Sequence, residues 1–303
     1  MAGGVGVKDL IKWLACFCLI LIAAWIAART SERLLEWDEE GVSQQQIMLK
    51  NGDLVDVETF VLYLAAAQVP VEYGPETLKC QAVIARTFLL REMDADWEFR
   101  AEKLGADYWD ERIMQKNWGL DYTKNREKFE MAVKETAGKT LQFEGDYIAP
   151  VFHRMSAGST RTAGEEFPYL IARKSTADLL AEEGWQVYTK SLKELATSLT
   201  NAGFSLKPGE FWTKVQIVAR DAAGYVEQVQ VGEVLISGEQ IAELWSLPSP
   251  CFRWEEAAGA VRIFCRGQGH GYGLSQNDAH AQEASGSTYE ELLQYFYPGT
   301  TVS

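Results

Sequence analysis

The sequence has few basic residues and few histidines for its length. It carries 29 Lys and Arg against 43 Asp and Glu, which gives a net charge of -14 over 303 residues. A nucleic-acid-binding protein needs clustered Lys and Arg to neutralise phosphates, so this composition predicts no nucleic-acid partner. Three His and five Cys leave little room for a zinc-rich protein. Internal repeats and low-complexity tracts are also absent, which excludes a solenoid or a disordered linker.

One long apolar run lies near the N-terminus. Positions 10–28 read LIKWLACFCLILIAAWIAA, with Lys12 as the only charge. At a rise of about 1.5 Å per residue, this run is just long enough to span a hydrocarbon core. We interpret 1–29 as a cytoplasmic tail and transmembrane signal anchor; a cleaved signal peptide is the alternative, because alanines near the end of the run suit a peptidase. In both cases we expect a single-pass or exported protein that works outside the cytoplasm, with a stalk at 30–49 and an ectodomain at 50–303.

Helical patterns come first in the remaining chain, and strand patterns follow. Hydrophobic content of 47% is enough for a packed core. Periodicity and capping residues predict helices over 56–67, 75–93 and 122–137. Alternating, β-branched runs predict strands over 140–144, 147–155, 186–190, 214–219 and 226–231, interrupted by helices over 191–201, 238–245 and 288–295. This order favours an α+β fold, with two lobes, behind the transmembrane helix.

Two cysteines bracket a hairpin pattern. Cys251 and Cys265 enclose two short β-like runs around an Ala-Gly turn. A disulfide across this hairpin and two buried thiols are both compatible with the sequence, because pairing cannot be read from spacing alone.

Three segments resemble the stage II sporulation protein D and amidase-enhancer family. They are PETLKCQAVIARTF at 75–88, HRMSAGST at 153–160, and GHGYGLSQ at 269–276, the last followed by YEELLQYFYPGT at 289–300. Three matched segments in order are more specific than any one glycine-rich loop. The resemblance implies a membrane-anchored peptidoglycan lytic transglycosylase, with lobes around a glycan-binding cleft. It would cut glycan strands lacking stem peptides in the septal space during engulfment, beside other cell-wall hydrolases.

The matched segments supply candidate substrate-binding residues. Lys79 and Arg86 share one face of the helix over 75–93 and are predicted to clamp sugar hydroxyls or a lactyl carboxylate, although a solvated charged stripe would look the same. Glycines alternate between 267 and 273, where the backbone can approach a ligand closely or adopt positive φ. Polar side chains of the other two segments complete the set: His153, Ser156, Ser159, Thr160, His270, Ser275 and Gln276.

Lytic transglycosylation needs one carboxyl group that is held protonated near neutral pH. The resemblance places the family's catalytic Glu at the position of Gln68, and an amide cannot donate a titrating proton. Glu72, beside Tyr73, is the better replacement acid, because an aromatic neighbour would desolvate it. Glu76 lies in the first turn of its helix, where the dipole favours the charged form, so a structural role is favoured for it.

Two functions therefore stay open from the sequence. One is a lytic transglycosylase with a displaced acid such as Glu72, and the other is a noncatalytic glycan-binding or amidase-enhancing protein that keeps the cleft. An unrelated membrane-anchored adhesion module would leave the three matched segments unexplained. The zinc site of some family members would need Cys or His between the second helix and His153, and 88–152 contain neither. We therefore predict no metal and no cofactor.

Overall fold

Helix α2 begins where the sequence supplies a cap and ends where a proline follows. A computed structural model describes residues 46–93 and 98–303. Asp56 accepts a hydrogen bond of 2.9 Å from the Thr59 backbone N–H and so caps α2 (Val57–Gln68). The helix stops before Val69, which is extended because Pro70 disfavours helical geometry in the preceding residue. Helix α3 (Pro75–Glu92) starts with proline at its first position, as predicted.

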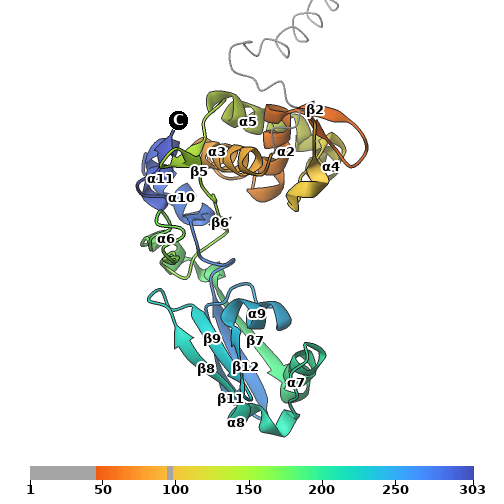
Figure 1. Cartoon of the computed structure of the whole chain (residues 1–303), viewed down its shortest axis with the longest axis vertical. Coiled ribbons are helices and arrows are strands. Elements are labelled where there is room, and N and C mark those ends of the chain that lie inside the picture. Colours follow the sequence, from red (N-terminus) through yellow and green to blue (C-terminus); the bar gives the residue numbers. More distant parts are fainter. Residues whose placement is uncertain (1–45, 94–97) are drawn as a thin grey trace, which may run out of the picture. The chain divides into compact units, whose positions relative to one another are not determined.

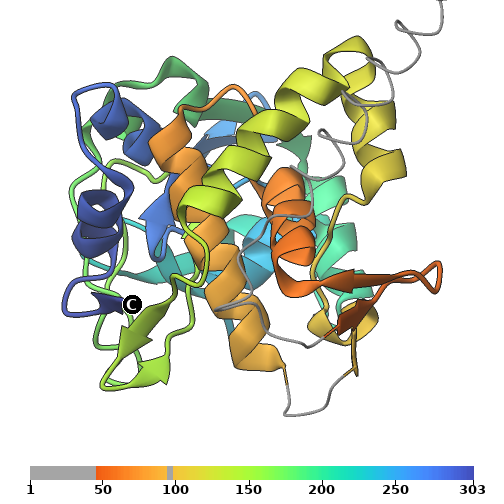
Figure 2. The same cartoon turned by 90° about the horizontal axis from the view of Figure 1, so that it is seen from above.

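The first third of the described chain is mainly helical. Figures 1 and 2 show α2, α3 and α5 lying against one another in this part. The side chains between these helices form a continuous apolar core that includes Phe60, Leu64 and Phe129. The elements are β1 (Gln46–Met48), β2 (Leu54–Asp56), α2, α3, β3 (Glu98–Arg100), α4 (Glu111–Trp118) and α5 (Tyr122–Glu135). Strand β1 lies within the stretch that the sequence assigned to a stalk.

Helix α3 is covered on both sides. Leu78 and Ala82 face the core shared with α2 and α5, whereas Cys80 and Ile84 belong to a second core shared with the C-terminal segment. The helix therefore has no broad solvent-exposed face, although its sequence contains several polar residues. The second core is closed by β4 (Leu141–Phe143), β5 (Asp146–Tyr147), β6 (Phe152–His153), β13 (Leu274–Ser275), α10 (Gln276–Glu283), α11 (Tyr289–Phe296) and β14 (Thr301–Val302).

Residues 185–266 build a third core around two small antiparallel sheets. The strand orders are β10-β9-β8 and β11-β12-β7. Trp245, Phe211 and Phe252 pack together at the centre of this core. The elements are β7 (Trp185–Ser191), α7 (Leu192–Asn201), α8 (Phe211–Lys214), β8 (Val215–Arg220), β9 (Val226–Val231), β10 (Val234–Ser237), α9 (Gly238–Leu244), β11 (Phe252–Ala257) and β12 (Ala260–Arg266). A short helix, α6 (Thr176–Leu180), precedes them.

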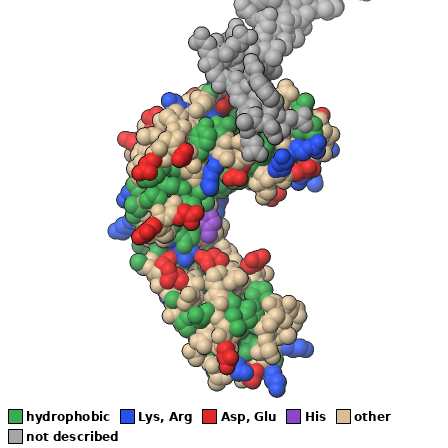
Figure 3. Space-filling view, in the orientation of Figure 1, with side chains coloured by type: hydrophobic (Ala, Val, Ile, Leu, Met, Phe, Trp, Pro, Cys, Tyr) green, Lys and Arg blue, Asp and Glu red, His purple; other side chains and the backbone are tan. Residues whose placement is uncertain are grey.

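The mixed helix-and-strand architecture agrees with the α+β prediction, but the fold class needs one correction. In the ranges 46–93 and 98–303, every helix is too short or too polar to cross a membrane, so the structure gives no support to a transmembrane helix as part of the fold. The run 10–28 on which that prediction was made lies outside the described residues, as do Cys16 and Cys18. On the face seen in Figure 3, acidic and basic side chains are interspersed with apolar ones.

Two local predictions are refined by the structure. The strand expected over 147–155 is reduced to the short β5 and β6, because Pro150 lies between them and cannot donate to a strand ladder. The hairpin between Cys251 and Cys265 is confirmed: β11 and β12 pair in register, with Phe252 opposite Cys265. Both cysteines are free thiols in this structure, and each hydrogen-bonds a backbone carbonyl.

Candidate functional site

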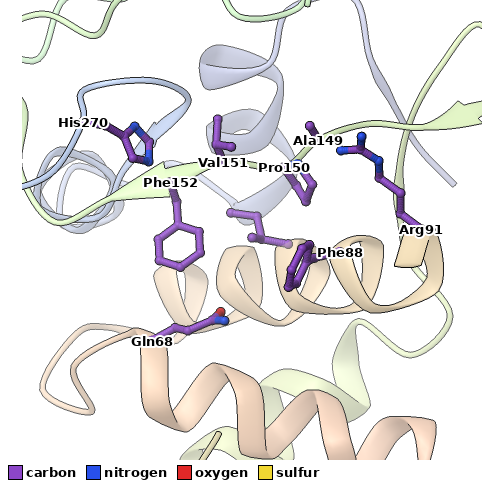
Figure 4. Close-up of a pocket in the computed structure, with 9 residues that line it drawn as sticks. Gln68, Phe88, Arg91, Ala149, Pro150, Val151, Phe152 and His270 are labelled. Atoms are coloured by element: carbon purple, nitrogen blue, oxygen red, sulfur yellow. The ribbon is translucent and has the colours of Figure 1, made fainter. Parts of the chain in front are cut away.

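A pocket lies where the end of α2, the C-terminal half of α3, the 149–152 segment and the glycine-rich loop meet. Its volume is about 220 Å³. Figure 4 shows the side chains of Gln68, Phe88, Phe152 and His270 around it. The lining is Gln68, Ile84, Phe88, Arg91, Ala149, Pro150, Val151, Phe152 and His270. The walls are thus mainly apolar, with an amide and an imidazole as the inner polar groups and a guanidinium from an exposed arginine. We call this cavity the Gln68 pocket.

Three glutamine side chains form a hydrogen-bonded chain behind the pocket. Nε2 of Gln276 donates to Oε1 of Gln81 at 3.0 Å and to the backbone oxygen of Gln68 at 2.9 Å. Nε2 of Gln81 then donates to Oε1 of Gln68 at 2.8 Å. Gln81 and Gln276 are buried, and Gln68 is half-buried. Because its oxygen is engaged and no described residue accepts from its nitrogen, Gln68 presents an amide N–H group for a ligand.

Gln81 is the member of this chain whose role sequence reasoning missed. By the helical period Gln81 lies on the side of α3 opposite Lys79 and Arg86, which indicates burial, and a buried amide needs hydrogen-bond partners. The structure confirms the burial, but the partners are the side chains of Gln68 and Gln276. Its position in the matched segment 75–88 was the available signal. Only the tertiary structure brings the segment 269–276 within reach of α3.

Two neutral histidines lie near each other beside the glycine-rich loop, with 5.8 Å between their ring centroids, and one of them, His270, lines the pocket. His153 is buried, and its Nδ1 donates to the Tyr272 carbonyl at 3.0 Å, which leaves Nε2 buried without a partner. Burial, with a smaller contribution from His270, lowers the pKa of His153 to about 3. Burial also lowers the pKa of His270, assisted by the Arg161 guanidinium. His270 Nδ1 accepts from the Tyr272 N–H, so its Nε2 is the protonated nitrogen.

The glycine-rich loop packs against protein. Gly273 has φ +67°, and a Cβ there would lie 1.9 Å from the Val151 carbonyl oxygen. Gly269 has φ +106°, and its Cβ would lie 2.6 Å from the Cβ of His153. The close approach that the sequence assigned to a ligand is therefore made, at these two positions, by the 151–153 backbone and side chains. This contact fixes His270 at the edge of the pocket.

The predicted serine and threonine ligands are occupied by internal hydrogen bonds. Asp178, which sequence reasoning missed, is buried and accepts from the Ser156 N–H at 2.8 Å and from the Ser275 hydroxyl at 2.7 Å. Ser159 donates its hydroxyl to the Thr160 carbonyl, and the Thr160 hydroxyl accepts from Arg173. Asp178 thus joins the 153–160 loop to the start of α10, and the Thr160 hydroxyl joins the loop to the Arg173 backbone. None of these side chains lines the Gln68 pocket.

The two residues after Gln276 take part in the same support. Asn277 donates from Nδ2 to Asp178 at 2.9 Å, and Asp278 accepts from the Ala177 N–H at 3.0 Å. Burial raises the pKa of Asp278. Both side chains thus hold the start of α6 against α10, and this role requires the polar groups that Asn277 and Asp278 supply.

Arg86 is not available to a glycan, in contrast to the sequence prediction. Its side chain is 1% exposed. Nε donates to Oε1 of Glu58 at 2.8 Å, and the remaining nitrogens contact Glu58 and the carbonyls of Lys139 and Val133. The prediction assumed that one face of α3 meets solvent, whereas α2 and α5 cover it. A buried arginine in this position ties three helices and the following loop together.

The two replacement acids also lie outside the Gln68 pocket. Glu72 is exposed and lines a separate surface hollow with Lys79 and Lys128. Tyr73 stacks on His280 at 4.6 Å between ring centroids, so it is engaged elsewhere. Glu76 pairs with Lys79 at 2.7 Å and accepts from the Tyr289 N–H at 2.8 Å, so its carboxylate is engaged by protein groups. Lys79 is held between Glu76 and Glu135.

Helix α3, which carries Gln81, is capped from a distant part of the sequence. Gly74 has no side chain with which to cap it. Glu283 supplies the cap: its carboxylate accepts from the Glu76 N–H at 2.9 Å, from the Thr77 N–H at 3.1 Å and from the Thr77 hydroxyl at 2.8 Å. A carboxylate at a helix N-terminus also benefits from the helix dipole. No local sequence signal indicates this contact, because the partners are more than 200 positions apart.

By fold and site, this is a mixed helix-and-strand protein with a pocket between a helix pair and a glycine-rich loop. Residues 45–143 match the family model described as Stage II sporulation protein. A stage II sporulation protein D from Bacillus amyloliquefaciens is 31% identical over 261 residues, which cover 82% of this chain and 74% of the relative. The chain belongs to the stage II sporulation protein D family. The corresponding protein of Bacillus subtilis (strain 168) is 29% identical over 266 residues, covering 82% and 75%.

The similarity extends to the amidase-enhancer branch named by the sequence motifs. An amidase enhancer of Bacillus subtilis (strain 168) is 23% identical over 295 residues, which cover 78% of this chain and 39% of that longer protein. The family resemblance identified from three short segments is therefore confirmed over most of the chain.

Proposed function

We propose that this protein acts in sporulation as a binding protein for peptidoglycan glycan strands, and that the Gln68 pocket holds one sugar of the strand. The observation that carries the proposal is the chemistry of the lining: an amide, a neutral imidazole and apolar side chains, with no carboxylate among the described residues that form the wall. The names of the sporulation relatives support the cellular process.

This lining is suited to an uncharged sugar. Hydroxyl and acetamido groups both donate and accept hydrogen bonds, and they would pair with the Gln68 amide nitrogen and with Nε2 of His270. Phe88 and Phe152 provide apolar surface for the C–H face of a sugar ring. The exposed guanidinium of Arg91, at the far end of the pocket in Figure 4, is placed to meet a lactyl carboxylate. Strands without stem peptides leave that carboxylate free.

The absence of an acid in the described lining argues against lytic transglycosylation by this chain. The reaction needs a carboxyl group that protonates the glycosidic oxygen. Gln68 stands at the position that the family resemblance assigns to that group. Glu72 is exposed beside two lysines, and Glu76 is held by Lys79 and a backbone N–H. Lytic transglycosylation is therefore the alternative function, and the experiment below must distinguish it from binding without cleavage.

The compartment and the partner enzymes of the protein follow from the same proposed function. We propose that the protein works outside the cytoplasm, in the septal space where glycan strands are remodelled, and that it presents strands to other wall hydrolases. The relative named amidase enhancer supports this last part, since its name describes an effect on another enzyme.

Binding and cleavage can be separated with one substrate. The full-length chain is mixed with stem-free glycan strands, binding is measured by co-sedimentation, and 1,6-anhydro ends are counted by mass spectrometry. We expect binding without new ends. Gln68→Leu should weaken binding by about tenfold, since one hydrogen bond in a buried site is worth about 1–2 kcal/mol.

The matched control is Gln216→Leu, which makes the same change at an exposed position on β8. It should bind as the wild type does, and thermal unfolding of both variants identifies any loss of folding. Production of anhydro ends by the wild type would overturn the binding-only proposal. Equal binding by wild type and Gln68→Leu would show that the Gln68 pocket does not hold the sugar.

A further inference from the structure

Three arginines surround a cavity on the sheet of residues 185–266, far along the sequence from Gln68. The cavity measures about 310 Å³ and lies between β8 and the β11-β12-β7 sheet. Arg220 comes from the end of β8, Arg253 from β11 and Arg266 from the end of β12. Figure 1 shows these strands together in the part of the chain below α9. We call this group the arginine cavity.

The sheet register explains why these side chains meet. Arg253 pairs with Phe264, and Arg266 pairs with Trp185, so in each pair both side chains project on the same face. Ile263 and Cys265, which alternate with Phe264 and Arg266 along β12, point to the opposite face and are buried in the core. The cavity therefore lies on the outer face of the sheet, where it can be reached from solvent.

The positive charge of the cavity is largely uncompensated. Arg220 donates to the carbonyls of Gly224 and Phe252, and Arg266 donates to the carbonyl of Leu179. Within the described ranges, neither guanidinium has a carboxylate oxygen within 4.0 Å. Arg253 has only an exposed pair with Glu255 at 3.4 Å, and such pairs contribute little. Nε of Arg266 is buried without a partner. Charge is thus concentrated here in a chain whose net charge is -14.

Aromatic rings hold two of the guanidiniums in place. Cζ of Arg266 lies 4.6 Å from the centroid of the Trp185 ring, and Cζ of Arg253 lies 3.9 Å from that of Phe264. Trp185 is 51% exposed although it is a large apolar side chain, and Val187, next but one on β7, is 58% exposed. Fixed guanidiniums lose little entropy on binding an anion, and exposed rings beside them provide a surface for a sugar.

We propose that the arginine cavity binds a phosphate group of an anionic, phosphate-bearing cell-wall glycopolymer, while Trp185 contacts an adjoining sugar or polyol. A phosphate carries oxygens in several directions and matches three guanidiniums that converge from separate strands. A single carboxylate is satisfied by one bidentate arginine. The cavity shares no lining residue with the Gln68 pocket, so this site goes beyond the proposed binding of neutral glycan.

The arginine cavity would give the protein a second binding site for the cell wall. Two weak sites on one polymer network raise the apparent affinity well above that of either alone, provided both can be engaged together. It would also direct an acidic protein to a polyanionic matrix, which a net charge of -14 would otherwise repel.

The test compares two preparations of the same cell wall. One retains its phosphate-linked polymers, and the other is stripped of them with hydrofluoric acid, which cleaves phosphodiester bonds. The full-length chain should sediment more strongly with the first. The double variant Arg220→Gln/Arg253→Gln should lose about tenfold or more of that affinity, because charge-assisted hydrogen bonds are worth about 1.5–3 kcal/mol each. Its binding to stripped wall and to stem-free glycan should be unchanged.

The matched control is Arg112→Gln/Arg262→Gln, which removes the same charge from exposed positions outside the cavity. It should retain at least most of the wild-type affinity. Inorganic phosphate should compete with the intact wall for the wild type. Trp185→Ala should weaken binding of the intact wall more than it weakens competition by inorganic phosphate, because it removes the sugar contact and only loosens Arg266.

Three results would overturn the proposal: equal affinity for intact and stripped wall, an equal loss in the control double variant, or unchanged binding in Arg220→Gln/Arg253→Gln. Thermal unfolding of each variant shows whether a loss of binding reflects a loss of folding. Failure of the phosphate site leaves stem-free glycan binding intact, whereas failure of the Gln68 pocket removes that binding and leaves the difference between the two wall preparations.

Discussion

Gln81 donates from Nε2 to Oε1 of Gln68 over 2.8 Å, and this bond determines which end of the Gln68 amide is left for the pocket. The Gln68 side-chain oxygen accepts this bond, so the Gln68 side-chain nitrogen is the group left to donate in the pocket. Gln276 supports both residues, because it donates to Oε1 of Gln81 and to the backbone oxygen of Gln68. The arrangement places a neutral donor at the position where the family resemblance expects an acid.

Gln68→Glu is expected to convert the binding site into a weak lytic enzyme. Glu is nearly isosteric with Gln, and the Gln81 donor remains for one carboxyl oxygen. The other oxygen would replace Nε2 beside Phe88 and Phe152, where burial raises the pKa of a carboxyl group. We expect 1,6-anhydro ends to form from stem-free glycan about 100-fold or more above the wild-type background, measured by mass spectrometry.

Gln216→Glu is the control for that experiment, because it adds the same charge at an exposed position on β8. It should produce no ends. If Gln68→Glu also produces none while folding and binding normally, Gln68 does not stand where an acid can act. Wild-type activity that Glu72→Gln abolishes would instead make Glu72 a displaced acid.

Arg86→Ala is expected to lower the free energy of unfolding of the protein and not to weaken glycan binding selectively. The substitution leaves the Glu58 carboxylate buried without its partner, and such losses cost about 3–5 kcal/mol. Urea unfolding followed by circular dichroism measures the change. Lys79→Ala, on the same helix but in a partly exposed pair, should cost less than about 1 kcal/mol. Comparable stability of the two variants would contradict the buried role of Arg86.

His153 should make the protein less stable as the pH falls below neutrality. Burial lowers its folded pKa to about 3 from 6.5, so below pH 6.5 the unfolded chain binds a proton that the folded chain does not. Stability from this group is complete above pH 6.5 and declines as the pH falls towards 3. Between pH ~7.5 and ~5.5 the loss is about 1.4 kcal/mol.

The lowered pKa of His270 acts in the same direction, whereas the raised pKa of Asp278 acts in the opposite one, so the effect of His153 must be isolated by substitution. His153→Gln should reduce the difference in unfolding free energy between the two pH values by about 1.4 kcal/mol. An identical pH dependence in wild type and variant would show that His153 titrates normally in the folded state.

Glu283→Ala should destabilise α3 although it changes a residue in α10. The substitution removes three hydrogen bonds at the N-terminus of α3, two of them from backbone N–H groups. We expect a loss of about 1–3 kcal/mol in urea unfolding. Glu290→Ala, at an exposed position in α11, should stay within about 0.5 kcal/mol of wild type. Equal effects of the two changes would mean that Glu283 does not cap α3.

Local sequence signals determined the longest helices, the β11–β12 hairpin and the family. Asp56 caps α2, Pro70 and Pro75 bound the turn between α2 and α3, and the Ala-Gly turn defines the β11–β12 hairpin. These features depend on neighbours within a few residues, so the sequence contains the information directly. Motif order carried the family assignment for the same reason, since it needs no knowledge of contacts.

The tertiary structure alone decided which polar residues line the Gln68 pocket. Arg86 and Lys79 share one face of α3, yet the first is buried by α2 and α5 and the second is held at the surface by Glu135. Burial of a helix face depends on the partners that pack on it, and those partners lie far away in sequence. The same holds for the hydrogen bonds between Gln276 and Gln81 and between Glu283 and Thr77, because only long-range packing brings these pairs together.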